Sequence, residues 1–424
     1  MAVPYFHVHS VIFDKCLGHM ACMRPCPTQA IRVRNSKAVI SEELCVDCGT
    51  CISVCPEEAI APTNTPHFDL SHYKYKVVVP SPVIYSQFDS NIHPYVIHLA
   101  FMEFGFDEVV DIGVSSSMLG RALVKYISRY KGRLPLISSH CPSALRLIQV
   151  KYPDLLDLVV PFDVPREITA REIRKTIPLK LGIKSEDIGI IYIAPCPAKI
   201  VSILQPAEKT QSWFDGFISV KEIYSKLYEH VAEIQKDFDE NQVPESFIFS
   251  SGWATFGSLT QSVKMKKWLA VSGLSHVMKI FDDIENSRLR NIDFVEALTC
   301  MLGCIGGPFS VENPYIARTN SIEQQERYEK PIEIDDEEIE QKLEAGYFSL
   351  ENKLVPRPTK YFDTDIKTSI KKMKEVERIY KKLRQIDCGC CGSPTCLAFA
   401  EDYVRGEVGL TDCIFLANQG LKSK

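Results

Sequence analysis

Residues 45–56 read CVDCGTCISVCP, and the four cysteines of this short stretch decide how the N-terminal part of the chain folds. Residues 16–27 read CLGHMACMRPCP, so each cysteine position recurs 29 residues later, with His19 in the place of one cysteine. A similar stretch follows each block, TQAIR at residues 28–32 and EEAIA at residues 57–61. The repeat predicts two copies of one small unit related by a pseudo-two-fold axis.

The composition is that of an ordinary globular protein with many thiols. The chain has 424 residues, of which 16 are cysteines and 45% are hydrophobic, enough for one large core and one or two small domains. A net charge of −5 without a long basic block gives nucleic acid or an anionic membrane little support as a partner. The sequence shows no transmembrane run and no signal peptide, so we expect a cytoplasmic protein whose reduced cysteines bind metal.

The spacing C-x2-C-x2-C-x3-C-P is the bacterial ferredoxin run, in which three thiolates hold one 4Fe-4S cube and the fourth reaches a second cube. It predicts two N-terminal 4Fe-4S clusters. The ligands of one are Cys26, Cys45, Cys48 and Cys51. Those of the other are Cys16, Cys22, Cys55 and His19. Ligation by the neutral imidazole of His19 would raise the reduction potential of that cluster. The alternative is that His19 faces solvent beside a cube with an open iron or a three-iron cluster.

After the proline-rich residues 61–67, short apolar runs alternate with helical segments, which is typical of an α/β domain. The runs that end on loops with cysteine or proline are residues 76–79, 134–137 and 188–193. Because ligands of open α/β sheets lie outside the carboxyl ends of the strands, we expect Cys141 and Cys196 to converge there. Two glycines, Gly306 and Gly307, follow the remaining pair of cysteines and are expected to let the backbone approach a bulky cofactor.

Three loops, SSHCP at residues 138–142, APCPAK at 194–199 and EALTCMLGCIGG at 296–307, resemble the active-site signatures of FeFe hydrogenases. With the ferredoxin block, the resemblance covers roughly residues 10 to 310. It implies an H-cluster, which is a 4Fe-4S cube joined through a shared cysteine to a di-iron unit with CO, cyanide and a dithiolate. By position, Cys304 is the shared cysteine. The implied ligands of the cube are Cys141, Cys196, Cys300 and Cys304.

The resemblance also implies groups that contact the two cyanides. Lys199 matches a lysine that donates a hydrogen bond to one cyanide, and Pro80-Ser81 resembles the strand-end pair that contacts the other. Taken alone, Lys199 reads as a surface lysine and Ser81 as a turn serine. Their match beside two ligand loops favours a bound di-iron unit that they orient and tune.

The usual proton path of the family is largely missing. His140 stands where the family has a relay cysteine, and it either carries protons or only packs beside the site. Ser202 replaces a glutamate, and residues 117–123 lack the acidic pair of the relay helix. Ala194 and Leu298 replace two methionines of the pocket. Loss of a relay lowers turnover by about 10²–10⁴-fold, so we expect a slow enzyme of the divergent, sensory or slow-uptake groups.

The C-terminal tail carries one more cysteine motif. Residues 364–386 place apolar side chains at helical spacing and predict an amphipathic helix with Ile366, Ile370, Met373, Ile379 and Leu383 on its apolar face. A run C-x2-C-x4-C-x16-C follows and resembles a small 4Fe-4S domain; zinc is the competing metal. The predicted ligands are Cys388, Cys391, Cys396 and Cys413. Cys390 is either a spare thiol or a swapped ligand.

The predicted architecture therefore has three parts. Residues 1–68 form a small α+β ferredoxin-like domain, residues 69–360 an α/β active-site domain, and residues 361–424 a helix with a small helical Fe-S domain. The predicted function is anaerobic interconversion of H₂ with protons and electrons at the H-cluster, with ferredoxin or a similar electron carrier as partner. One alternative is an H₂ or redox sensor that signals through a regulatory partner protein. Another is a non-hydrogenase Fe-S relative that lacks the di-iron unit.

Overall fold

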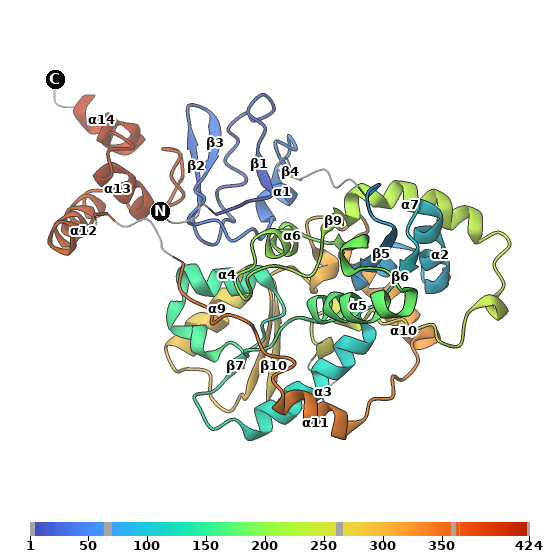
Figure 1. Ribbon diagram of the computed structural model, residues 1–424. Helices are drawn as coiled ribbons and strands as arrows, with labels where there is room; N and C mark the ends of the chain where they lie inside the picture. The colour runs from blue at the N-terminus through green and yellow to red at the C-terminus, as the bar shows by residue number, and fades with distance from the viewer. Residues whose placement is uncertain (1–4, 63–69, 260–265, 358–361, 364, 422–424) are drawn as a thin grey trace. The chain divides into compact units, whose positions relative to one another are not determined.

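The computed structural model describes residues 5–62, 70–259, 266–357, 362–363 and 365–421, and the chain divides into two compact units (Figure 1). We call Met1–Thr65 together with Pro356–Lys424 the cysteine-rich unit, and Pro66–Val355 the sheet unit. The three domain boundaries expected from the sequence stay predictions. Among the described helices, none has the length and apolar character needed to cross a membrane.

Two parallel sheets form the centre of the sheet unit. The first has the order β6(Glu108–Val109), β5(Tyr75–Pro80), β8(Ile188–Ala194), β9(Gly216–Ser219). The second has the order β10(Trp268–Ser272), β11(Phe294–Leu298), β7(Leu136–Ile137). Strand β8 is buried along its whole length, as expected for a parallel strand covered on both faces. The α/β class predicted from alternating apolar runs is confirmed.

Helices cover both faces of these sheets. Between β5 and β8 and the pair α2 and α7, the core contains Val78, Ile191, Phe101 and Leu227. On the second sheet, Val295 packs with residues of α4 and α9, while Phe294, its neighbour on the other face, packs with residues of α3. The helices of this unit are α2(Pro94–Phe104), α3(Gly113–Arg129), α4(Pro142–Lys151), α5(Pro165–Leu181), α6(Pro197–Leu204), α7(Val220–Ile234), α9(Leu274–Glu285), α10(Pro314–Tyr328) and α11(Asp336–Glu344).

Two of these helices begin directly after a predicted ligand. Cys141 and Cys196 are the residues that precede α4 and α6, and a proline follows each as the first helical residue. Proline suits that position because its fixed φ matches the helix and its missing N–H would have no partner there. The free N–H groups of a first helical turn favour negative charge. Each cysteine therefore lies where an anionic group is stabilised.

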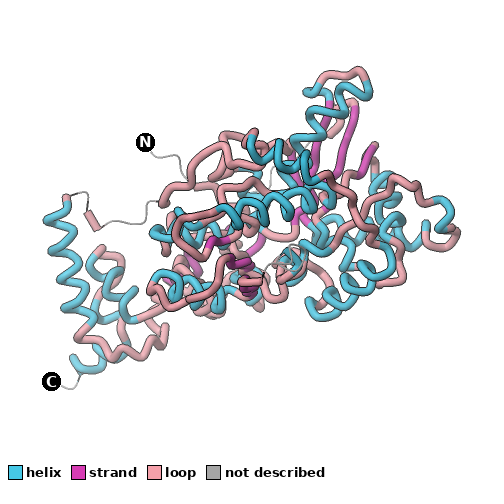
Figure 2. Tube along the Cα trace, turned by 90° about the horizontal axis from the view of Figure 1, so that it is seen from below, coloured by secondary structure: helices cyan, strands magenta, loops and turns pink. Residues whose placement is uncertain are grey.

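The cysteine-rich unit has few and short strands, and loops make up much of it. Strand β1(His9–Val11) pairs antiparallel with β4(Ile60–Pro62), and β2(Ile31–Arg34) pairs with β3(Lys37–Ile40). The described helices are α1(Thr50–Val54), α12(Ile366–Tyr380), α13(Cys396–Val404) and α14(Ile414–Leu421). In Figure 2, helices and loops likewise dominate the chain and the strands are short.

The C-terminal amphipathic helix forms, but its predicted apolar face is only partly correct. Ile379 is fully buried and packs with Val376 and Phe399 in a small core. Ile366 and Met373, by contrast, are 75% and 59% exposed. The helix covers α13 only with its second half, so the periodic pattern continues beyond the surface that it buries. Residue 364, where the prediction began, lies outside the described residues.

Candidate active site

Four loops that leave the carboxyl ends of parallel strands carry the predicted site residues. The loop after β5 holds Ser81, that after β7 holds Cys141, that after β8 holds Cys196, and that after β11 holds Cys300 and Cys304. In parallel sheets these ends lie on one edge, where ligands bind. The expectation of strands that end on ligand loops matches this geometry.

Backbone contacts tie the loops together. The Ser81 N–H donates to the carbonyl of Ile193 at 3.2 Å, which joins the ends of β5 and β8. The Phe309 N–H donates to the carbonyl of Pro195 at 3.1 Å, so the loop after β11 lies against the loop of Cys196. Ser81 is fully buried. Loops that are far apart in sequence are therefore held in one place by main-chain bonds.

The glycines near Cys304 lie tightly against neighbouring backbone. A Cβ on Gly306 would lie 2.2 Å from the carbonyl oxygen of Met301, and one on Gly307 would lie 2.7 Å from that of Pro195. Gly303 has φ +97°, and a Cβ there would lie 2.6 Å from the backbone nitrogen of Phe256. These glycines make room for neighbouring backbone. The expected approach of backbone to a cofactor stays a prediction.

The thiols of three loops lie within electrostatic reach of one another. Burial, together with the neighbouring thiols of Cys304 and Cys141, raises the pKa of Cys196 to about 12. The Nζ of Lys199 lies 3.4 Å from the Sγ of Cys304. Cys300 shares its loop with Cys304. Two of the predicted ligands, Cys304 and Cys196, are therefore neighbours of the cation of Lys199.

Lys199 is a buried cation and not a surface lysine. Its side chain extends from the first turn of α6 and is 4% exposed. Burial lowers the pKa of Lys199, but the neighbouring groups of Cys304, Tyr192 and Cys196 outweigh that effect, so the pKa is above its ordinary value. A buried ammonium group is stable only beside negative charge. An anionic iron-sulfur group at these thiolates would supply that charge.

His140 lies in the same region, enclosed by apolar side chains. Its ring meets Trp253 edge-on, with centroids 5.4 Å apart, and it lines a cavity together with Ser138 and Asp163. Both ring nitrogens are buried without a hydrogen bond in the described structure. Burial, and then the charges of Lys199 and Arg166, lower the pKa of His140 well below its ordinary value. The imidazole is neutral at pH 7, and both roles considered for it stay open.

Arg166 is a neighbour that the sequence patterns did not reveal. It is 3% exposed at the start of α5, and its Nη2 donates to the Oγ of Ser202 at 2.7 Å. Its Nε has no partner in the described structure. Ser202 stands where the resemblance implies a glutamate. The serine at this position accepts its hydrogen bond from a buried cation, Arg166. A lone arginine carries no motif, so only the fold could place it beside Lys199.

A second buried group of charges lies beside the cavity of His140. Lys209 Nζ is 2.6 Å from a carboxylate oxygen of Asp163 and 3.3 Å from one of Glu167. All three side chains are almost inaccessible to solvent. One cation between two carboxylates is a paired network, which makes burial of these charges tolerable. It holds the loop of Asp163 that lines the cavity.

The residues present fit the group that the resemblance implies. The buried cation of Lys199 and two helix starts lie beside thiols, and neither ring nitrogen of His140 nor the Nε of Arg166 has a hydrogen-bond partner in the described structure. Buried polar atoms are nearly always hydrogen-bonded, so such unpaired atoms together indicate a missing polar neighbour. An anionic iron-sulfur group with acceptor atoms meets this need. The roles of Lys199, His140, Pro80 and Ser81 stay predictions.

The N-terminal cysteines of the cysteine-rich unit lie close to one another, and their division into two ligand sets stays a prediction. One cavity is lined by the four residues of one predicted set, which are Cys16, His19, Cys22 and Cys55. In the other set, burial raises the pKa of Cys51 well above its ordinary value, and the thiols of Cys48 and Cys26 add to the rise. Backbone N–H groups point at sulfur in both sets: Ala38 to Cys16 at 3.3 Å and Ala30 to Cys26 at 3.2 Å.

His19 is half exposed beside its cavity. Its side chain is 47% exposed, and Nδ1 lies 3.7 Å from a carboxylate oxygen of Glu57. This geometry agrees with either of the two readings of His19. The sequence patterns also missed Asp47, which is fully buried, lies 2.9 Å from Nδ1 of His7 and is two residues from Cys45.

The C-terminal motif also brings its cysteines together. Burial raises the pKa of Cys391, and the thiols of Cys413 and Cys388 add to the rise. Cys396 is the first residue of α13, and Cys390 is exposed. An exposed Cys390 fits the reading as a spare thiol, which stays a prediction.

Three family models match parts of the chain. Residues 74–258 and 254–308 match the C-terminal domain of the iron-only hydrogenase large subunit, which together is more than half of the chain. Residues 10–56 match a 4Fe-4S dicluster domain, and residues 383–415 match a putative Fe-S cluster domain. The resemblance noted in the sequence is confirmed.

Known proteins agree with this assignment. The chain is 22% identical to iron hydrogenase 1 of Clostridium pasteurianum over 255 residues, which is 50% of this chain and 44% of that protein. It is 22% identical to the NADP-reducing hydrogenase subunit HndD of Solidesulfovibrio fructosivorans over 227 residues, 46% of this chain and 39% of that protein. The chain thus spans less than half the length of either relative.

One solved structure is similar in fold to this chain. A variant of the FeFe hydrogenase HydA1 from Chlamydomonas reinhardtii superposes with a TM-score of 0.50 at 16% identity, over 70% of this chain and 97% of that chain. At this identity the likeness speaks for the fold alone. Together with the family models, it leads to one conclusion: this chain belongs to the iron-only, or FeFe, hydrogenase family.

Proposed function

We propose that this protein interconverts H₂ with protons and electrons at an H-cluster in the sheet unit, with slow turnover. The observation that carries the proposal is the buried Lys199 Nζ, 3.4 Å from the Sγ of Cys304, among thiols from three separate loops. A buried cation in a ring of thiols is costly unless an anionic cofactor occupies the ring. The family match and the three Fe-S motifs support the same redox function.

In this proposal the H-cluster would be held by Cys141, Cys196, Cys300 and Cys304, and it would supply heterolytic cleavage of H₂ and storage of the electrons. Lys199 would donate a hydrogen bond to an anionic ligand of the di-iron unit. Pro80 and Ser81, which are buried at the end of β5, would contact another anionic ligand. The apolar wall that includes Trp253 excludes water.

The slow turnover follows from the proton path. His140 is buried against Trp253, and Ser202 stands where the resemblance implies a relay glutamate, so the proton path of the family is altered at two points. A positioned acid or base contributes about 10²–10⁴-fold to a proton-transfer step. Electrons leave through the 4Fe-4S clusters of the cysteine-rich unit to ferredoxin or a similar carrier. We place the protein in the cytoplasm, where such carriers and reduced thiols occur.

The test is infrared spectroscopy of protein matured with the di-iron cofactor, combined with an H₂-oxidation assay using a low-potential dye. We expect CO and cyanide bands and a measurable but slow rate. The control is Lys180→Gln, which changes an exposed lysine of α5. It should leave the infrared bands and the rate of H₂ oxidation unchanged. Absence of the bands after competent maturation would overturn the proposal in favour of a relative that lacks the di-iron unit.

A further inference from the structure

The C-terminal cysteine motif packs directly on the hairpin β2–β3 within the cysteine-rich unit. The Val33 N–H, on the free edge of β2, donates to the carbonyl of Gly392 at 2.8 Å. Gly392 directly follows Cys391 and has φ +74°, and a Cβ there would lie 1.9 Å from the Val33 carbonyl oxygen. Backbone meets backbone at this point, which only glycine permits. The contact is therefore built into the fold of both segments.

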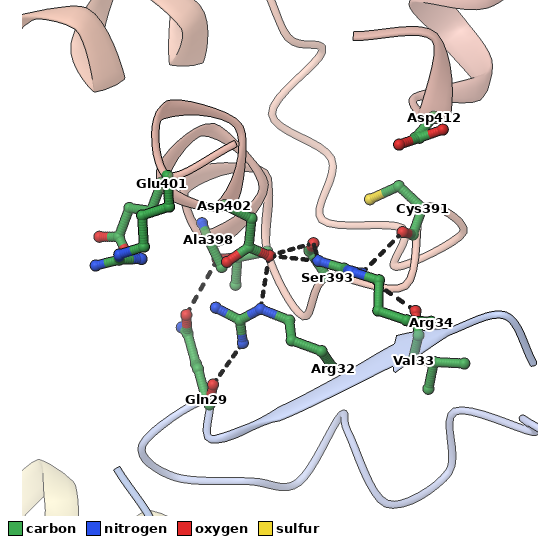
Figure 3. A network of polar contacts seen from close by, with 12 residues as sticks. Gln29, Arg32, Val33, Arg34, Cys391, Ser393, Ala398, Glu401, Asp402 and Asp412 are labelled. Atoms are coloured by element: carbon green, nitrogen blue, oxygen red, sulfur yellow. Dashed lines mark hydrogen bonds and ion pairs between the residues drawn. The ribbon is translucent and has the colours of Figure 1, made fainter. Parts of the chain in front are cut away.

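A buried carboxylate forms hydrogen bonds across the same contact. Figure 3 shows Asp402 of α13 between Arg32 and Arg34 of β2. One oxygen of Asp402 accepts from Arg32 Nε at 2.6 Å and from Arg34 Nη2 at 2.7 Å. The Oγ of Ser393 donates to that oxygen at 2.7 Å. The Asp402 side chain is 2% exposed, so this charge depends on its partners from the other segment.

The arginines also reach the ligand loop itself. Arg34 Nη1 donates to the carbonyl of Cys391 at 3.2 Å, and its Nη2 donates to Ser393 Oγ at 3.0 Å (Figure 3). Arg32 Nη1 donates at 2.6 Å to the carbonyl of Gln29, which lies near Cys26 in the sequence. Two guanidinium groups thus bridge the two cysteine motifs. Arginine suits this task because its planar fork makes several directed bonds at once.

The contact lies beside one particular cluster site. Val33 lines the cavity of Cys16, Cys22 and Cys55. A Cβ on Gly389, which sits between Cys388 and Cys390, would lie 3.1 Å from the terminal methyl of Met23. Met23 is fully buried and directly follows Cys22. The C-terminal motif therefore touches Val33 and Met23, a residue that lines this cavity and a residue that follows one of its cysteines.

We infer that the C-terminal Fe-S motif is a docked relay that exchanges electrons directly with the cluster of Cys16, Cys22 and Cys55, and that the clamp of Asp402 with Arg32 and Arg34 fixes this docking. One electron passes from the reduced C-terminal cluster to the oxidised N-terminal one, and no bond forms or breaks. A low-potential one-electron carrier supplies the electron. The inference extends the proposed function, because it uses its Fe-S clusters, but it requires neither the di-iron unit nor H₂.

The test compares the full-length, iron-reconstituted protein with Asp402→Asn by hydrogen exchange at the Val33 amide and by electron paramagnetic resonance of the reduced clusters. Removal of one partner of a buried ion pair should lower the exchange protection of Val33 by roughly 10²-fold or more. The parent should show magnetic coupling between the two clusters, and the variant should lose it while its iron content is retained.

Two further variants separate docking from folding. Arg32→Gln with Arg34→Gln removes the clamp from the other side and leaves the C-terminal motif unchanged, so it should reproduce the losses of Asp402→Asn. Glu401→Gln alters the neighbouring carboxylate, which pairs with Arg405 in its own helix, and should change neither signal. Rapid exchange of Val33 in the parent, or unaltered coupling in both clamp variants, would overturn the inference. If the Val33 amide of the parent were protected from exchange but the two clusters showed no magnetic coupling, the proposed electron relay would be refuted.

Discussion

The two kinds of metal site in this chain are built in opposite ways. In the cysteine-rich unit, three predicted ligands of each N-terminal cluster lie a few residues apart on one loop and the fourth comes from the other cysteine block, and backbone N–H groups contact the sulfurs of Cys16 and Cys26. In the sheet unit, Cys141, Cys196 and Cys304 come from three loops that only the parallel sheets bring together. The first kind depends on local spacing. The second depends on strand order and on packing around a buried cation.

This difference shows where each site is vulnerable. An N-terminal site depends mainly on one loop, since three of its four predicted ligands lie there and only the fourth comes from the other cysteine block. The site in the sheet unit needs the helices α4 and α6 to begin where they do, and it needs glycines that let the loops touch. Substitutions should therefore separate the two kinds of site, and the expected effects differ in size.

The largest effect is expected from Cys304→Ser compared with Cys51→Ser. Loss of the shared ligand should abolish the CO and cyanide bands and H₂ oxidation, while the electron paramagnetic resonance of the other clusters persists. Cys51→Ser should do the reverse, with loss of one N-terminal cluster signal and retention of the infrared bands. If Cys304→Ser kept the bands, the proposed shared ligand would be wrong.

His140→Ala should have the next largest effect if the imidazole relays protons. Turnover should then fall by about 10²–10⁴-fold, and His140→Cys should restore part of it. Both variants should keep the infrared bands, since His140 is not a ligand. An unchanged rate in His140→Ala would leave packing against Trp253 as its only role.

Lys199→Met should weaken retention of the di-iron unit by about 10–100-fold, as is typical when a group that supports a metal site is lost. The reason is that the buried ammonium group at 3.4 Å from Cys304 balances the negative charge of the site. Infrared band intensity per cube, followed during dilution or chelation, measures the effect. Equal retention in Lys199→Met and the parent would refute this role.

The smallest effect is expected from His19→Cys in the cysteine-rich unit. A thiolate in place of a neutral imidazole makes the cluster more negative and lowers its reduction potential. A redox titration followed by electron paramagnetic resonance measures the shift, with Cys390→Ser as a control that should shift nothing. No change of potential in His19→Cys would favour the reading in which His19 only faces solvent, in keeping with its 47% exposure.

Much of the fold could be predicted from the sequence, but unevenly. The buried run of β8 and the loops that follow β5, β7 and β8 were visible as apolar stretches that end on cysteine or proline. The apolar face of α12 was partly wrong, because Ile366 and Met373 follow the helical period without a surface to cover. Helical periodicity indicates which residues of α12 could be buried. Which of them are buried depends on contact with the neighbouring helix α13.

The sequence by itself determined the repeat of the N-terminal motif and the family, and it predicted the ligands, because the spacing of cysteines within a loop is a local property. Only the tertiary structure decided that Arg166 lies beside His140 and Lys199, and that Asp402 binds two arginines about 370 residues away. Buried charges carry no periodic signal, and their partners come from distant segments. Electrostatic neighbours therefore become visible only when the chain is folded.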